Sequence, residues 1–177
     1  MNYREAPPPG RRLGKLMAIA AWLLGLAMLT LLFGNLERSW LNPNQQPVSA
    51  VTTKGVQEVT LKANRQGHYL VSGSINDIAV DFLLDTGATD VAISENMAQH
   101  LGLQKGLRGT ASTANGNVTV YATRIQRLQI GSIILYDVPA SINPSMGEFI
   151  LLGMSALRQV EFTQRDNLLT LRNYPNS

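Results

Sequence analysis

The sequence predicts an all-β domain with one short helix, preceded by a single N-terminal transmembrane helix. From residue 56 onward, short alternating or apolar runs are separated by turn residues, and almost no helical period is present. Upstream of them, residues 16–34 are apolar without one charged side chain. Only 15% of the 177 residues are charged, against roughly 25% in average soluble chains.

The first segment, residues 1–15, is a basic tail with four Lys or Arg residues and one acid, Glu5. The rest of the chain holds 11 basic and 11 acidic residues, so the net charge of +3 belongs to the tail. A nucleic-acid-binding domain carries its basic patch on the folded part, so we expect no nucleic acid as a partner. Cysteine is absent and the two histidines, His68 and His100, show no ligand spacing. We therefore expect no metal and no other cofactor.

The apolar run 16–34 is long enough to cross a bilayer as a helix, since each residue adds about 1.5 Å toward the ~30 Å hydrocarbon core. A cleaved signal peptide is the alternative. Its apolar region usually has about 7 to 15 residues before a small-x-small site, which residues 35–40 do not offer. The preceding basic tail favours a cytoplasmic N-terminus. Residues 35–55, rich in Pro, Asn and Gln, are expected to link this anchor to a domain over 56–177 on the far side.

Turn residues divide the domain into successive strands. A hairpin turn at Asn76-Asp77 joins strands 68–75 and 78–84. After strand 91–93, Ser94 is expected to cap the short helix, with Gly102 past its end. Residues 110–121 predict a second hairpin. Further strands are expected near 59–61, 125–130, 133–138, 149–152, 160–162 and 168–171.

The chemistry concentrates at Asp85-Thr86-Gly87-Ala88, directly after the apolar end of strand 78–84. A carboxylate is costly to bury alone, so Asp85 is expected to reach solvent or to share its charge with a nearby group. Thr86 offers a hydroxyl for a bond across a tight turn, and Gly87 lets another backbone approach closely. The alternative is an ordinary strand-ending turn, in which Asp and Gly are common.

Three features in order resemble the retropepsin-like aspartic proteases, and in particular their bacterial, single-domain, membrane-anchored members. They are the Asp-Thr-Gly-Ala turn, the Asn115-Gly116 hairpin some thirty residues later, and Ile150-Leu151-Leu152-Gly153. The resemblance covers about residues 56–171 and implies a closed or curled β-barrel. It also implies roles for individual residues: catalysis by Asp85, support of the catalytic loop by Thr86, Gly87 and Ala88, a substrate-covering flap at Asn115 and Gly116, and a floor at Leu152 and Gly153.

The resemblance also implies a homodimer. Aspartic proteases need two carboxylates about a water, whereas this sequence has one Asp-[Thr/Ser]-Gly. A C2 homodimer with a shared active site supplies the second Asp85. The implied activity is hydrolysis of polypeptides by an aspartic endopeptidase at the inner membrane, with its domain in the periplasm and the lipid bilayer as a partner. The alternative is a catalytically silent peptide-binding or assembly module at the membrane.

The sequence departs from the retroviral pattern beside the catalytic turn. Retroviral members have an acidic residue two positions after the turn glycine and an arginine after the C-terminal glycine. Thr89 and Met154 occupy these positions here, so both halves of that ion pair are missing. Asp90 is a candidate for binding substrate backbone, and a solvated loop carboxylate is the alternative.

Overall fold

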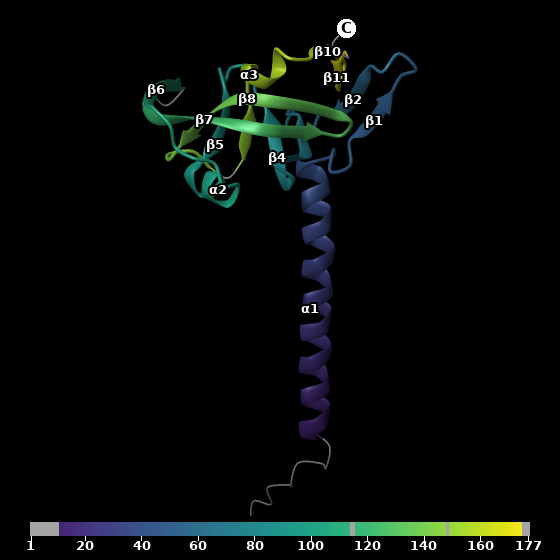
Figure 1. The fold of residues 1–177 in the computed structure, drawn as a ribbon. Coiled ribbons are helices and arrows are strands. Elements are labelled where there is room, and N and C mark those ends of the chain that lie inside the picture. Colours follow the sequence, from purple (N-terminus) through teal and green to yellow (C-terminus); the bar gives the residue numbers. More distant parts are fainter. Residues whose placement is uncertain (1–10, 114–115, 148, 175–177) are drawn as a thin grey trace, which may run out of the picture. The chain divides into compact units, whose positions relative to one another are not determined.

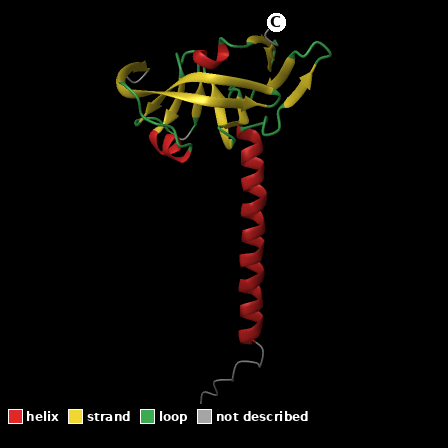
Figure 2. Cartoon of the chain, in the orientation of Figure 1, coloured by secondary structure: helices red, strands yellow, loops and turns green. Residues whose placement is uncertain are grey.

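The computed structural model describes residues 11–113, 116–147 and 149–174 of the chain (Figure 1). The chain divides into two compact units, Met1–Ser39 and Trp40–Ser177, which are described separately. Figure 2 shows that strands dominate the second unit and that its helices are short.

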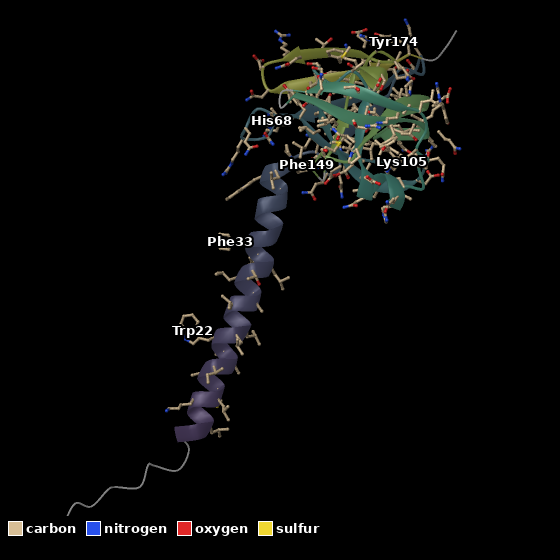
Figure 3. The ribbon with its side chains drawn as sticks, turned by 90° about the vertical axis from the view of Figure 1, so that its left-hand side faces the viewer. Trp22, Phe33, His68, Lys105, Phe149 and Tyr174 are labelled. Atoms are coloured by element: carbon tan, nitrogen blue, oxygen red, sulfur yellow. The ribbon has the colours of Figure 1, made fainter. Side chains whose placement is uncertain are left out.

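The first unit consists of most of helix α1 (Arg11–Leu41). Over Leu13–Leu41 this helix is long and apolar enough to cross a membrane, with a mean hydropathy of 2.4. Its large apolar side chains are exposed, among them Trp22, which is 80% accessible, and Figure 3 shows Trp22 and Phe33 projecting from the helix. The helix includes the whole predicted span 16–34 and extends beyond both of its ends.

The second unit contains a four-stranded antiparallel sheet in the order β1-β2-β11-β10. Its strands are β1 (Val48–Val51), β2 (Gln57–Lys62), β10 (Glu161–Arg165) and β11 (Leu168–Asn173). One face of β2 and β11 carries buried residues such as Val59 and Leu171. The other face carries an ionic network, in which the Arg172 guanidinium binds Glu58 at 2.7 Å and lies 3.5 Å from Glu161.

The larger sheet has seven strands in the order β3-β4-β9-β5-β8-β7-β6, and a further pairing of β3 with β7 curls it into a barrel. Its strands are β3 (Leu70–Ile75), β4 (Ile78–Leu84), β5 (Val91–Ser94), β6 (Arg108–Thr113), β7 (Gly116–Ile130), β8 (Ile133–Asn143) and β9 (Ile150–Leu152). Gly73 permits the closure, because a Cβ there would lie 2.2 Å from the Gln129 carbonyl oxygen. The predicted all-β class and curled barrel are thereby confirmed.

The inner faces of both sheets share one hydrophobic core. Its largest fully buried side chains are Leu61, Ile75, Phe82, Ile93, Ile125, Leu128, Ile133, Ile142, Ile150, Leu152, Leu157 and Leu171. Helix α2 (Glu95–His100) begins after Ser94, whose hydroxyl accepts a bond from the Met97 amide as predicted. A second short helix, α3 (Met154–Leu157), was not predicted, because four residues are too few to show a helical period.

The segment expected to be a linker, 35–55, instead holds the end of α1, strand β1 and two buried asparagines. The Asn44 side chain takes the place of a strand partner. Its Oδ1 accepts from the Lys62 amide at 2.7 Å, and its Nδ2 donates to the Leu70 carbonyl at 2.6 Å. Asn42 donates to Ser72 at 3.0 Å. The Pro, Asn and Gln residues of this segment predicted a flexible linker, but the Asn42 and Asn44 side chains bind the segment to the folded domain.

Two hairpins bear on the site. The Asn76-Asp77 turn is present, with both residues at positive φ between the paired Ile75 and Ile78, as a type I′ turn requires. The strand predicted over 125–130 is instead the second half of β7, which continues from the preceding hairpin as a single strand of 15 residues.

Candidate active site

Asp85 follows β4 at a point where strands lie on both sides. β4 pairs with β3 on one side and, in parallel, with β9 on the other. The Asp85 amide donates to the Leu152 carbonyl at 3.2 Å, which continues the β4–β9 pairing by one residue. The double pairing satisfies the main-chain groups of the apolar run Phe82–Leu84, in which Phe82 is buried and the other two side chains are half-buried. The Asp85 side chain itself is half-buried.

The turn after Asp85 fixes one of its carboxylate oxygens. The Gly87 amide donates to Asp85 Oδ1 at 2.8 Å, and the Ala88 amide donates to the Asp85 carbonyl at 3.2 Å. Within the described part of the chain, Asp85 Oδ2 and the exposed Thr86 hydroxyl have no hydrogen-bond partner. The turn therefore presents one carboxylate oxygen and one hydroxyl toward solvent.

The floor of the site is the chain from β9 into α3. The Met154 amide donates to the Ala88 carbonyl at 2.8 Å, and the Ser155 amide donates to the Thr89 carbonyl at 2.9 Å. Gly153 is buried at this crossing. A Cβ there would lie 2.2 Å from the Asp90 carbonyl oxygen and 2.7 Å from that of Ala88. The structure thus brings Leu152 and Gly153 against the Asp85–Ala88 turn, which lies more than sixty residues earlier in the sequence.

Ser155 is a supporting residue that sequence reasoning missed. Its hydroxyl donates to the Pro139 carbonyl at 2.7 Å and accepts from the Val91 amide at 2.9 Å. It therefore joins α3 to β5 and β8 where the chain leaves the loop after Asp85. Together with the main-chain bonds to Ala88 and Thr89, it holds this loop without the ion pair of the retroviral pattern. The sequence gives no signal for this role, since a serine after Met154 fits many structures.

The expected flap is an exposed hairpin of β6 and β7. Thr113 of β6 pairs with Gly116 at the start of β7. Asn115 lies outside the described residues. Gly116 opens β7 with φ of +105°, and its carbonyl accepts a bond from the Thr113 hydroxyl at 2.7 Å. The glycine is needed there for its positive φ in the strand.

Asp90 lies in a separate groove. This half-buried residue lines a cavity of about 570 Å³ bordered by the loop Gly102–Gly106 and by β7, and none of residues 85–88 belongs to that lining. The Asp90 carboxylate has no hydrogen-bond or ion-pair partner among the described residues. The structure therefore places Asp90 in a groove that residues 85–88 do not line, while its carbonyl oxygen lies against Gly153 of the floor. The same described ranges contain no group of three His, Cys, Asp or Glu residues that could hold a metal ion.

Comparison with known proteins identifies the family. The model of the gag-polyprotein putative aspartyl protease family matches residues 71–159, half of the chain. That range includes the Asp85 turn, the β6–β7 hairpin and the floor at Gly153. The chain belongs to this retropepsin-like family.

Two relatives and a solved structure are also similar to the chain. A Sinorhizobium sp protein described as uncharacterized is 30% identical over 147 residues, covering 80% of this chain and 62% of its own. An uncharacterized protein of Rickettsia prowazekii (strain Madrid E) is 28% identical over 122 residues, covering 67% and 52%. The chain thus spans only about three-fifths and one-half of these relatives. A crystal structure of a retropepsin-like aspartic protease from Rickettsia conorii matches with a TM-score of 0.55 and 25% identity, covering 72% of this chain and 95% of that one.

Proposed function

We propose that this protein is a membrane-anchored aspartic endopeptidase that is active as a homodimer. The observation that carries the proposal is the Asp85-Thr86-Gly87 turn. It lies within the segment that matches the family model, and among the described residues it leaves one carboxylate oxygen and the Thr86 hydroxyl without partners.

A twofold axis beside this turn would complete the site. It would set a second Asp85 opposite the first, and each Thr86 hydroxyl would bond across the axis to hold the two loops in register. Because the chain carries one Asp-Thr-Gly, one interface then builds one active site. The β6–β7 hairpin would cover a substrate that lies as an added strand over the floor.

The chemistry follows from charge sharing. In aspartic proteases two carboxylates about 3 Å apart hold one proton between them, because both cannot ionise cheaply. The ionised Asp85 takes a proton from water as the water oxygen attacks the scissile carbonyl carbon. The protonated Asp85 donates its proton to the carbonyl oxygen. As the C–N bond of the tetrahedral intermediate breaks, the Asp85 that took the water proton gives it to the leaving nitrogen, and the other Asp85 recovers a proton from the diol. The products are an amine and a carboxylic acid, and no acyl-enzyme forms because water is the nucleophile.

Helix α1 is proposed as the anchor, in a single pass through the inner membrane. Its apolar side chains suit lipid, and the basic tail before it favours an N-terminus in the cytoplasm, which leaves the domain in the periplasm. Confinement to a membrane raises the effective concentration of the domains. A dimer too weak to persist in solution would then form at the membrane.

The test is cleavage of a denatured protein mixture at acid pH by the full-length protein in detergent. Asp85→Asn is the matched variant, because its amide oxygen can still accept the Gly87 amide while the shared proton is lost. We expect cleavage by the wild type and none by the variant. Equal cleavage by both would refute the role of Asp85, and cleavage by neither would favour the silent peptide-binding or assembly module.

Mixing the two forms tests the shared site. At equal amounts, random pairing leaves about one quarter of the dimers with two intact Asp85 residues, whereas independent monomers would retain half of the activity. A hydroxyl-containing transition-state analogue should likewise bind once per two chains. Retention of half of the activity, or binding of one analogue per chain, would contradict the dimer.

A further inference from the structure

The barrel has a gap along one edge of β7. On that edge β6 pairs with β7 as far as Tyr121, and the loop before β6 bonds to Ala122 through the Gly106 amide at 2.7 Å. The next partner is Asn76, whose amide donates to the Arg127 carbonyl at 2.9 Å. Residues 123–126 therefore have only β8 as a strand partner in the described structure. We call these four residues the open edge, which is about 13 Å long.

The backbone of Arg124 faces out of this gap. Arg124 pairs with Pro139 of β8, and proline has no N–H with which to exchange hydrogen bonds. The pair therefore occupies a non-hydrogen-bonded position of the antiparallel ladder, where both backbones direct their N–H and C=O groups away from each other. Ala122, two residues earlier, bonds in the same outward direction to Gly106 and Leu107. The Arg124 N–H and C=O are thus available to an incoming strand.

The open edge borders the groove of about 570 Å³ that Asp90 lines. Three charged side chains line this groove, and two of them have partners. Lys105 pairs with Glu95 at 2.5 Å, and Arg124 pairs with Asp137 at 2.8 Å. The half-buried Asp90 carboxylate is the lining charge without one in the described residues. A ligand with a cationic group for Asp90 and an extended backbone for the Arg124 main chain would therefore complement this groove.

We propose that this groove docks an extended segment of the polypeptide substrate that carries a lysine or arginine, outside the catalytic cleft. One residue of the segment would exchange two main-chain hydrogen bonds with Arg124, as in other cases of strand addition. Its basic side chain would pair with Asp90, because charge-assisted bonds form readily to a partly desolvated carboxylate. That the docked segment belongs to the substrate rests on the proposed function as a protease.

The groove lies beside the catalytic machinery, which favours substrate as the occupant. The Asp90 carbonyl contacts the backbone of Gly153 at the floor, and Asp90 is five residues from Asp85. Gly106 and Ala122, which form the wall of the groove, lead directly into the two strands of the flap hairpin. A polypeptide held here would have its neighbouring segments close to the cleft, which raises their effective concentration there.

Binding can be measured without catalysis. The probe is a fluorescent peptide of alternating threonine and valine with a central lysine, titrated into full-length Asp85→Asn protein in nanodiscs. We expect binding together with protection of the Arg124 amide in hydrogen exchange. Adding Asp90→Asn should weaken binding about fivefold to tenfold. Asp166→Asn is the matched control, because it removes the same charge at an exposed turn with positive φ and should leave binding unchanged.

Two altered peptides test the recognition. A peptide with glutamate in place of lysine, and one N-methylated at alternate residues, should each bind at least fivefold more weakly. Equal binding of the lysine and glutamate peptides would overturn the role of Asp90. Protection of the Gly87 and Gly116 amides without that of Arg124 would overturn the site, because the peptide would then occupy the cleft alone.

Catalysis tests whether the occupant is substrate. A peptide from a site cleaved in denatured casein is compared with the same peptide bearing a basic extension. We expect the extension to lower KM severalfold for the wild type and to give no advantage to Asp90→Asn. Cleavage without any such advantage would overturn the docking role and leave the proposed protease standing. Peptide binding at Arg124 in a protein that cleaves nothing would overturn the substrate assignment and the protease together.

Discussion

Replacing Gly153 with alanine adds one methyl group where the floor crosses the catalytic loop. The new Cβ would lie 2.2 Å from the Asp90 carbonyl oxygen and 2.7 Å from that of Ala88. The first contact is about 0.8 Å closer than the 3.0 Å limit below which real Cβ atoms essentially never approach. Both obstacles are main-chain atoms, so no side-chain rotation relieves the overlap. The Gly153 φ of −87° is allowed for alanine, which leaves the steric overlap as the only cost.

The expected destabilisation is at the upper end of the range for overpacked cores, about 2–3 kcal/mol. In a domain of this size, it lowers the Tm by roughly 5–10 °C. A shift of the loop by nearly 1 Å would also misplace Asp85, and a displacement of that size can cost about a hundredfold in kcat. Urea unfolding followed by circular dichroism measures the first effect, and cleavage of a peptide substrate measures the second.

Gly109→Ala is the matched control, because the nearest atom to a Cβ at Gly109, in exposed β6, is 3.9 Å away. Its free energy of unfolding should change by no more than about 0.5 kcal/mol. If Gly153→Ala is as stable as this control and retains activity, the close crossing of floor and loop does not exist as described.

Three further predictions concern other parts of the domain. Ser155→Ala should cost about 1–3 kcal/mol, because a main-chain amide of β5 loses its acceptor, and unchanged urea unfolding would contradict the supporting role of this serine. The Tyr174 hydroxyl donates to Glu161 at 2.9 Å, which raises the pKa of Tyr174, so this stabilisation is full below about pH 10 and disappears as pH rises through the folded pKa. Ultraviolet titration should show the pKa falling in Glu161→Gln, and an unchanged value would refute the assigned cause. Asn44→Ala should cost about 2–4 kcal/mol, because it leaves the main-chain partners of Asn44 in Lys62 and Leu70 unpaired. Alanine at exposed Gln45 is the control, and equal stability of the two variants would contradict the role of Asn44 in holding the segment to the domain.

Local patterns were sufficient for much of the fold. Strand β4, the Asn76-Asp77 turn and the capped helix α2 follow from alternation, positive-φ tolerance and a capping serine, all of which act over a few residues. The Asp85 turn was likewise visible as a turn after an apolar strand, but its residues alone fitted an ordinary strand-ending turn equally well. Its place beside Gly153 came from family resemblance and not from any local rule.

Features that depend on distant partners could not be predicted. Asn44 looks like a turn former until the strands it bonds to are in place, and Ser155 acquires its role only when β5 and β8 meet there. Gly116 was singled out as a turn residue, and the structure shows it at positive φ where it opens β7 opposite Thr113. The open edge of β7 is invisible in sequence, since it is defined by where β3 and β6 stop.

Strand β9, with three residues, lies between β4 and β5. The floor beside Asp85 therefore comes from the last third of the polypeptide. On the ribosome, the Asp85 segment emerges long before Ile150–Leu152, and pairings of such sequence separation are slow to form. A nascent chain therefore carries the Asp85 turn without its support until synthesis is nearly finished. For the proposed protease, this order of assembly would delay activity until the domain is complete.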